Sequence, residues 1–134
     1  MIPAVDAVVA EFGQDVRFTE INVQSDLVNL FVSTGDGSER AVVFHGGELE
    51  VPDEVQPAPA GTEAFDLSSV DLDAASRFDE LLRPELPESR LAVLTLTQTA
   101  ETGLTWQAVM VGAQGTGFAV VLSPAGAILG ALSD

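Results

Sequence analysis

The stretch Ala41–Glu50, read AVVFHGGELE, has a near copy in the second half of the chain at Ala119–Leu129, read AVVLSPAGAIL. Both stretches begin with a strand-like apolar run, pass through a turn rich in Gly or Pro, and end in a second short apolar run. Residues 31–44 align with residues 109–122 without a gap, and the turn that follows needs one extra residue in the second copy. This likeness predicts that one small structural unit occurs twice.

Alternating residues predict strands on both sides of these stretches. In Leu104–Val111 one face carries Leu104, Trp106, Ala108 and Met110. For the first strand, alternation does not decide which face is buried. Val16 and Phe18 lie on one face, and Ile21 and Val23 lie on the other. The predicted strands are Val16–Val23, Leu27–Ser33, Glu39–His45, a short one at Leu49–Val51, Arg90–Thr99, Leu104–Val111, Phe118–Leu122 and Ala127–Leu132.

Each half also begins with an amphipathic helical pattern. Pro3–Phe12 starts with a proline suited to a first helical position and is followed by Gly13, a residue suited to ending a helix. Val70–Arg83 follows Ser68, which resembles a capping-box residue together with Asp71. The sequence thus predicts two helices, one before each set of strands.

A Pro-rich segment at 52–66 crosses the middle of the chain and is the expected join between the halves. The predicted organisation is a first α+β repeat at 1–51, this linker, and a second α+β repeat at 67–134. The predicted fold class is α+β, with two helix-plus-antiparallel-β-meander repeats packed as one compact unit. The other fold considered, a single helix-sheet domain of the secretion-chaperone type, would need a final helix that the sequence does not indicate.

Composition limits the classes of partner. The 134 residues carry 21 acidic and 5 basic side chains, for a net charge of −16. This charge disfavours nucleic acids and anionic membranes and favours a protein with a basic or mixed surface. No apolar run approaches the length of a membrane helix, cysteine is absent, and the start lacks the basic-then-apolar pattern expected of a signal peptide. The compartment stays open: an extracytoplasmic location is favoured if a signal or anchor was removed, and a cytoplasmic one otherwise.

No catalytic or metal-binding pattern stands out. His45 is the only histidine, so neither a multi-histidine metal site nor a triad with a second histidine is available. Gly112–Gly117 lacks the Lys-Ser/Thr ending of a phosphate loop and opens no helix. Glu48 and Glu50 share one strand face and are read as a solvated edge. The sequence predicts a protein that is not an enzyme and has no cofactor and no metal.

The meanders resemble PepSY-like modules and the related β-lactamase-inhibitor-protein-like fold. In the second half the resembling residues are Trp106–Val111, Phe118–Leu122 and Ala125–Leu129; in the first half they are Leu30–Val32, Ala41–Phe44 and Gly47–Leu49. The resemblance covers most of the chain as a tandem pair. It implies a non-catalytic, usually extracytoplasmic module that binds or inhibits another protein, and it transfers no functional residue.

A sheet with helices on one side leaves its other face free for binding. We expect that face to be the interaction surface, and its candidate residues are Phe31, Thr95, Thr97, Gln107, Glu48 and Glu50. The predicted function is a non-enzymatic protein-interaction or inhibitor-like module. The alternatives are a secretion-chaperone-like binding protein and a carrier of a small or apolar ligand, the latter with a cavity lined by Trp106, Met110 and Phe78.

Overall fold

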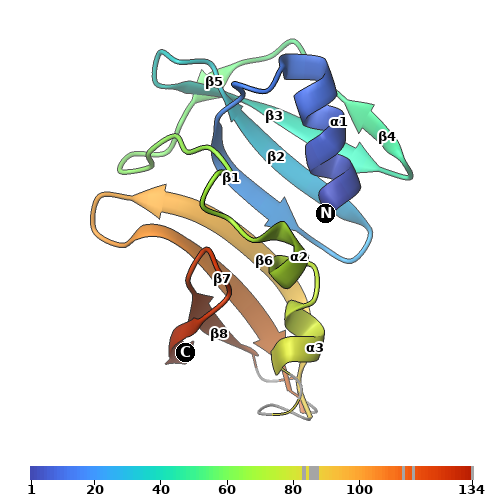
Figure 1. Ribbon diagram of the computed structural model, residues 1–134, viewed down its shortest axis with the longest axis vertical. Coiled ribbons are helices and arrows are strands. Elements are labelled where there is room, and N and C mark those ends of the chain that lie inside the picture. Colours follow the sequence, from blue (N-terminus) through green and yellow to red (C-terminus); the bar gives the residue numbers. More distant parts are fainter. Residues whose placement is uncertain (83, 85–87, 113, 116, 134) are drawn as a thin grey trace.

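The protein combines an N-terminal helix with a nine-strand antiparallel sheet, which confirms the predicted α+β class (Figure 1). This computed structural model describes residues 1–82, 84, 88–112, 114–115 and 117–133. The helices are α1 (Ile2–Phe12), α2 (Leu72–Ala75) and α3 (Phe78–Leu82). The strands are β1 (Phe18–Val23), β2 (Leu27–Ser33), β3 (Ser38–His45), β4 (Glu48–Glu50), β5 (Gln56–Pro57), β6 (Arg90–Thr99), β7 (Gly103–Val111), β8 (Gly117–Leu122) and β9 (Ile128–Ser133).

The strands of both halves belong to one continuous sheet. Its order is β4-β3-β2-β1-β6-β7-β8-β9, with β5 paired to β3 beside β4. The halves meet where β1 pairs antiparallel with β6, from Glu20 opposite Thr97 to Val23 opposite Leu94. The two predicted meanders are therefore joined edge to edge through backbone hydrogen bonds, and the sheet crosses the predicted boundary between them.

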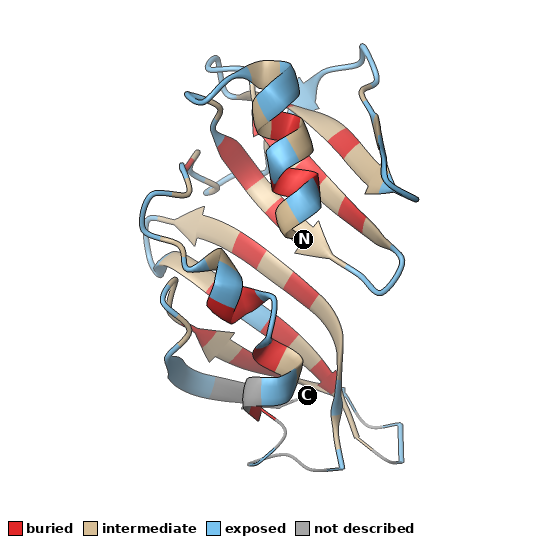
Figure 2. Ribbon diagram, turned by 45° about the vertical axis from the view of Figure 1, so that its right-hand side comes forward, coloured by how far each residue is buried: buried red, intermediate tan, exposed pale blue. Residues whose placement is uncertain are grey.

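The core is a row of apolar side chains that runs across this sheet. Successive direct partners on β3, β2, β1, β6, β7 and β8 are at most 1% exposed, and they are Val42, Leu30, Ile21, Leu96, Trp106 and Leu122. All helices lie against this face, so the buried segments of the strands face them (Figures 1 and 2). One apolar layer thus serves both halves of the chain.

A β-bulge explains why alternation alone does not identify the buried residues of the first strand, β1. Phe18 pairs with Val32, and Ile21 pairs with Leu30, although Phe18 and Ile21 are three residues apart. The register shifts between Phe18 and Glu20, so Thr19 is the extra residue of a β-bulge. Both Phe18 and Ile21 therefore reach the core, which simple alternation does not allow.

The helix predictions are confirmed only in part. α1 begins at Ile2 and ends before Gly13, which has a φ of 100°. The single second helix predicted for Val70–Arg83 is wrong: the chain forms α2 and α3, separated at Ser76–Arg77. There the Ser76 hydroxyl donates to the Asp73 carbonyl at 2.8 Å, a local bond that competes with helix continuation. Arg83 lies outside the described residues.

Asp71, and not Ser68, caps α2. Its carboxylate accepts a hydrogen bond from the Ala74 backbone N–H at 2.9 Å. Ser68 instead donates to the Asp66 carboxylate through both its backbone N–H and its hydroxyl. The expected capping box is therefore replaced by a single Asp cap.

The segment 52–66 does more than connect the halves. Its β5 pairs with β3 at Ser38–Glu39, and its far end returns to the centre of the sheet. There Phe65 exchanges two backbone hydrogen bonds of 2.8 Å with Phe18, and the Glu63 N–H donates to the Gln98 carbonyl at 2.8 Å. The segment thus links β3 to both strands of the β1–β6 junction. Across the described part of the chain, the helices are all too short to cross a membrane.

Candidate functional site

The sheet face turned away from the helices, which we name the helix-free face, spans both halves of the chain. Directly paired residues point to the same face of a sheet, so the strand register assigns its residues in rows. One row is Ala41, Phe31, Glu20, Thr97 and Thr105. A second row runs through Glu50, Val43, Asn29, Asn22, Thr95, Gln107 and Val121.

All six sequence-predicted residues share this face. Phe31 and Thr97 lie in the first row on either side of Glu20, and Thr95 and Gln107 are direct partners in the second row. Glu50 ends that second row, and Glu48, two residues away on β4, pairs with His45. Gln107, Glu48 and Glu50 are exposed, whereas Phe31, Thr95 and Thr97 are half-buried. The structure therefore brings together Phe31, Thr95, Thr97 and Gln107, and places the two glutamates at the β4 edge.

Sequence reasoning missed the side chains that lie between the predicted ones. Asn22, on β1, donates from its side-chain amide to the Thr95 hydroxyl at 3.1 Å, across the junction of the halves. Gln24 in turn donates to the Asn22 side-chain oxygen at 3.0 Å. The polar residues Asn22 and Thr95 thus form a fixed link at the centre of the helix-free face.

A buried carboxylate lies at the β3 side of this face. Glu39 is 2% exposed, and its two oxygens accept hydrogen bonds of 2.9 Å from Thr19 and from the Gln56 side chain. Thr19 is the bulged residue of β1, and Gln56 belongs to β5. The Glu39 carboxylate therefore fastens the Pro-rich segment to the sheet.

Glu20 has a perturbed acidity. Burial raises the pKa of its carboxyl above the ordinary value, and the nearby negative charge of Glu39 raises it further. Glu20 is also the residue between Phe31 and Thr97 on the helix-free face. The centre of this face therefore holds a carboxylate that a cationic group of a partner would stabilise.

The charge of the helix-free face is divided between the halves. On β1 to β4 this face carries Glu20, Glu39, Glu48 and Glu50. On β6, β7 and β8 the described residues of the face include no acid; Arg90, which pairs with Val111 at the start of β6, is charged, and the other positions carry Thr, Gln, Val, Ala and Gly. A partner would meet an acidic surface on one side of the β1–β6 junction and, around Thr95, Thr97 and Gln107, a neutral one on the other.

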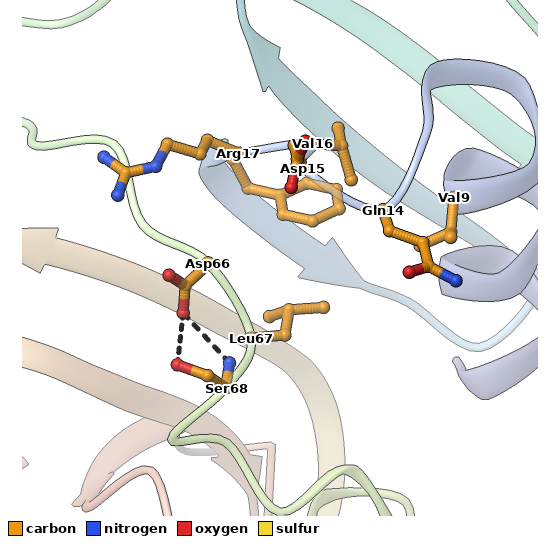
Figure 3. Close-up of a pocket in the computed structure, with 9 residues that line it drawn as sticks. Val9, Gln14, Asp15, Val16, Arg17, Asp66, Leu67 and Ser68 are labelled. Atoms are coloured by element: carbon orange, nitrogen blue, oxygen red, sulfur yellow. Dashed lines mark hydrogen bonds between the residues drawn. The ribbon is translucent and has the colours of Figure 1, made fainter.

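A separate cavity of about 490 Å³ lies between the end of α1, the start of β1 and the end of the Pro-rich segment. Its lining combines apolar Val9, Val16, Phe18 and Leu67 with polar Gln14, Asp15, Arg17, Asp66 and Ser68 (Figure 3). Asp66 accepts both hydrogen bonds of Ser68, at 3.0 and 2.5 Å. These bonds lower the pKa of Asp66, and the nearby Arg17 lowers it further.

The other candidates do not form a site. Trp106, Met110 and Phe78 are at most 1% exposed, and the Phe78 and Trp106 rings pack edge to face at 5.8 Å. They fill the core, and the cavity beside α1 and three further hollows between described residues are lined by other side chains. His45 is exposed, and Glu39, the buried acid, lies six residues away on β3. Within the described ranges no three His, Asp or Glu side chains gather as metal ligands.

Comparisons with models of known protein families, with curated proteins and with solved structures gave no match.

Proposed function

We propose that this protein is a non-enzymatic protein-interaction or inhibitor-like module that binds its partner through the helix-free face. The observation that carries this proposal is the β1–β6 pairing, which joins Phe31, Thr97 and their neighbours into one surface. Helices cover the opposite face, so this face is the larger part of the sheet left to a partner.

The chemistry of the face favours a partner with a basic or mixed surface. The Glu20 pKa is raised first by burial and then by the Glu39 charge, so a partner's Lys or Arg would stabilise the ionised carboxylate against both effects. The acidic net charge of −16 would also speed the approach of a basic protein. On the neutral side, Thr97 and Gln107 offer hydrogen-bonding groups on short or moderately flexible side chains.

Thr97→Glu with Gln107→Glu tests this proposal. Two added charges on the neutral side should abolish capture of the partner in a quantitative pull-down from source lysate, while the circular dichroism spectrum stays that of the folded protein. The melting temperature should fall, because a glutamate at 97 stands directly opposite Glu20. The charge-matched control is Ala10→Glu with Ser69→Glu, at exposed positions on the helix side of the molecule. Proteins captured equally by the wild type and both double variants would contradict the assignment of this face.

We further propose that the halves are copies of one α+β unit, as the PepSY-like resemblance implies. Support comes from the register of the second hairpin in each half. The partners Val28 and Phe44 become the partners Trp106 and Leu122 when 78 is added to both numbers. The next pair is Phe44 with Leu49 in the first half and Leu122 with Ile128 in the second. Here 78 is added to the first residue number and 79 to the second. The single extra residue is the one that the sequence alignment requires.

The cavity between α1 and the Pro-rich segment supports a second candidate, a carrier of a small ligand. Its apolar lining would hold the body of an amphiphile, and Arg17 and Asp66 would meet its polar end (Figure 3). A fluorescent apolar probe tests this candidate: Leu67→Lys should weaken probe binding, whereas Val55→Lys, at an exposed residue outside the cavity, should not. Equal binding by both variants would exclude the cavity.

A further inference from the structure

The two edges of the sheet differ in length and chemistry. At one end β4 has three residues, and two of them are Glu48 and Glu50. At the other end β9 has six residues, Ile128–Ser133, and none of them is charged. Short strands and charged side chains protect an edge from pairing with another chain. The β4 edge carries both protections, and the β9 edge carries neither.

The β9 edge also exposes large apolar side chains. Ile128 is 47% exposed and Leu129 is 61% exposed; of the large apolar residues in the described chain, only Val55, at 48%, is comparably exposed. β9 pairs with β8 on one side, and no described strand lies on its other side. The backbone groups on that side are therefore available to a further strand.

The charge distribution indicates which molecule supplies that further strand. No charged residue occurs from 102 to 133, although the whole chain has a net charge of −16. This uncharged stretch includes the whole of β7, β8 and β9. A second copy of the chain, repelled elsewhere by its acids, meets least repulsion at this end. A basic partner would find a single acid next to β9 in the sequence, Asp134, which follows its last residue.

We propose that β9 is the contact strand of a symmetric dimer, in which the β9 strands of two copies pair antiparallel. Such pairing is self-complementary, since each copy offers the same edge to the other across a two-fold axis. The β-bulge of β9 lies at its start, between Ile128 and Gly130, so the regular ladder to β8 extends from Gly130 to Ser133. The two copies would form one continuous sheet with both β4 edges outward. This proposal does not depend on the proposed function.

Sedimentation measurements on the whole chain test the dimer, starting from a monomer mass of 14.0 kDa. We expect the mass to double as protein concentration rises. The dimer should strengthen from about 0.01 M to about 1 M salt, because the Debye length falls from about 30 to about 3 Å and screens the acidic repulsion. An interface made of ion pairs would weaken over the same range. A monomer at every concentration and salt overturns the proposal.

Charged variants locate the interface. Both Leu129→Lys and Leu129→Glu should reduce association at least tenfold, because either charge would be buried beside the partner strand. If only net charge mattered, the lysine variant would associate more strongly than the wild type, and that result would contradict the proposal. Val55→Lys and Val55→Glu are the matched controls, because Val55 is a similarly exposed apolar residue on the Pro-rich segment.

A distance measurement separates loss of the interface from loss of the fold. The chain has no cysteine, so Ala127→Cys provides a single attachment site for a spin label just before β9. The labelled protein should give one defined distance between copies, and adding Leu129→Glu should remove it while the circular dichroism spectrum stays unchanged. No distance between copies for Ala127→Cys, with association intact, would place the interface elsewhere.

Discussion

Ile21 pairs directly with Leu96 across the junction of the two halves, and both side chains are fully buried. They occupy the middle of the apolar row that crosses the sheet from Val42 to Leu122. Burial of this pair means that neither half completes its core alone. We therefore expect the chain to unfold as one cooperative unit.

Ile21→Ala and Leu96→Ala test this expectation. Each should lower the free energy of unfolding by about 2 to 5 kcal/mol, because each leaves a cavity in a packed core. Together they should deviate from additivity, because the two side chains occupy one packed site. Urea denaturation of the single and double variants measures both quantities. Val55→Ala is the control, and at an exposed site it should change stability by about 0.5 kcal/mol or less.

Two separate unfolding transitions in the wild type, with only one of them shifted by Leu96→Ala, would contradict cooperative unfolding. Strictly additive effects of Ile21→Ala and Leu96→Ala would place the two side chains in independent cores.

The Glu39 carboxylate should stabilise the docked Pro-rich segment. Glu39→Ala removes the 2.9 Å acceptor of the buried Thr19 hydroxyl, which keeps only the longer contact of 3.3 Å to the Phe31 carbonyl, and it releases the exposed Gln56 amide to water. The total cost should be about 1 to 3 kcal/mol. We expect lower stability and faster proteolysis within 52–64. Glu39→Gln should lose less, because its amide oxygen still accepts from Thr19 and a turned Gln56 amide can pair with its nitrogen.

Glu63→Ala is the matched control for Glu39→Ala. Glu63 is exposed and belongs to the same segment, and its hydrogen bond to Gln98 uses the backbone N–H. Equal proteolysis of Glu39→Ala and Glu63→Ala would show that the buried carboxylate does not hold the segment.

The alternation of apolar and polar residues predicted much of this fold, because successive side chains of a strand point to opposite faces of the sheet. The Leu94–Leu96 face and the Trp106–Met110 face are buried as their alternation predicts, and the same alternation placed Thr95, Thr97 and Gln107 together on the other face. The β1–β6 pairing was not predictable in this way. Its partners are more than 70 residues apart, and nothing local selects which strand edges meet.

Other differences also have physical causes. A bulge at Thr19 shifts the alternation of β1, and a bulge leaves little trace in residue type. A glutamate is normally read as exposed, so the burial of Glu39 becomes evident only when Gln56 and Thr19 are brought to it by the fold. The break between α2 and α3 coincides with the hydrogen bond of the Ser76 side chain. The apolar residues of this segment are spaced as in a single helix, so their pattern does not reveal the break.

Glu20 should make stability depend on pH. Its pKa is raised in the folded state by burial and by Glu39, so the folded protein binds this proton more tightly than the unfolded chain does. Its contribution therefore favours folding at low pH and is lost as pH rises through the raised pKa. At neutral pH Glu20→Gln should stabilise the protein, and this gain should vanish below the ordinary pKa of glutamate.

Chemical denaturation of Glu20→Gln at several pH values measures this effect. Glu101→Gln makes the same change in net charge at an exposed turn and is the control. A gain in stability that is equal for the two variants would reflect overall charge. A Glu20→Gln variant less stable than the wild type at neutral pH would contradict the stated direction of the shift.

The pKa of Asp66, which lines the cavity of Figure 3, is shifted in the opposite direction to that of Glu20. Its pKa is lowered, first by the hydrogen bond from the Ser68 hydroxyl, then by the Ser68 backbone N–H, with a smaller effect of Arg17. Ser68→Ala removes the first cause and keeps the second, so the Asp66 pKa should rise while staying below its ordinary value. Arg17→Gln should raise it less. The stabilisation from Asp66 is present above the ordinary pKa of aspartate and is lost as pH falls through the lowered pKa.

Carboxyl titration by NMR measures these pKa values directly. Asp36 is an internal control in the same spectra, because its pKa is lowered by a different partner, the Thr34 hydroxyl. Ser68→Ala should leave the Asp36 titration unchanged. If Arg17→Gln shifted the Asp66 pKa more than Ser68→Ala did, the charge of Arg17 would be the dominant influence on this carboxylate. The hydrogen bonds of Ser68 would then contribute little to the polar side of the cavity.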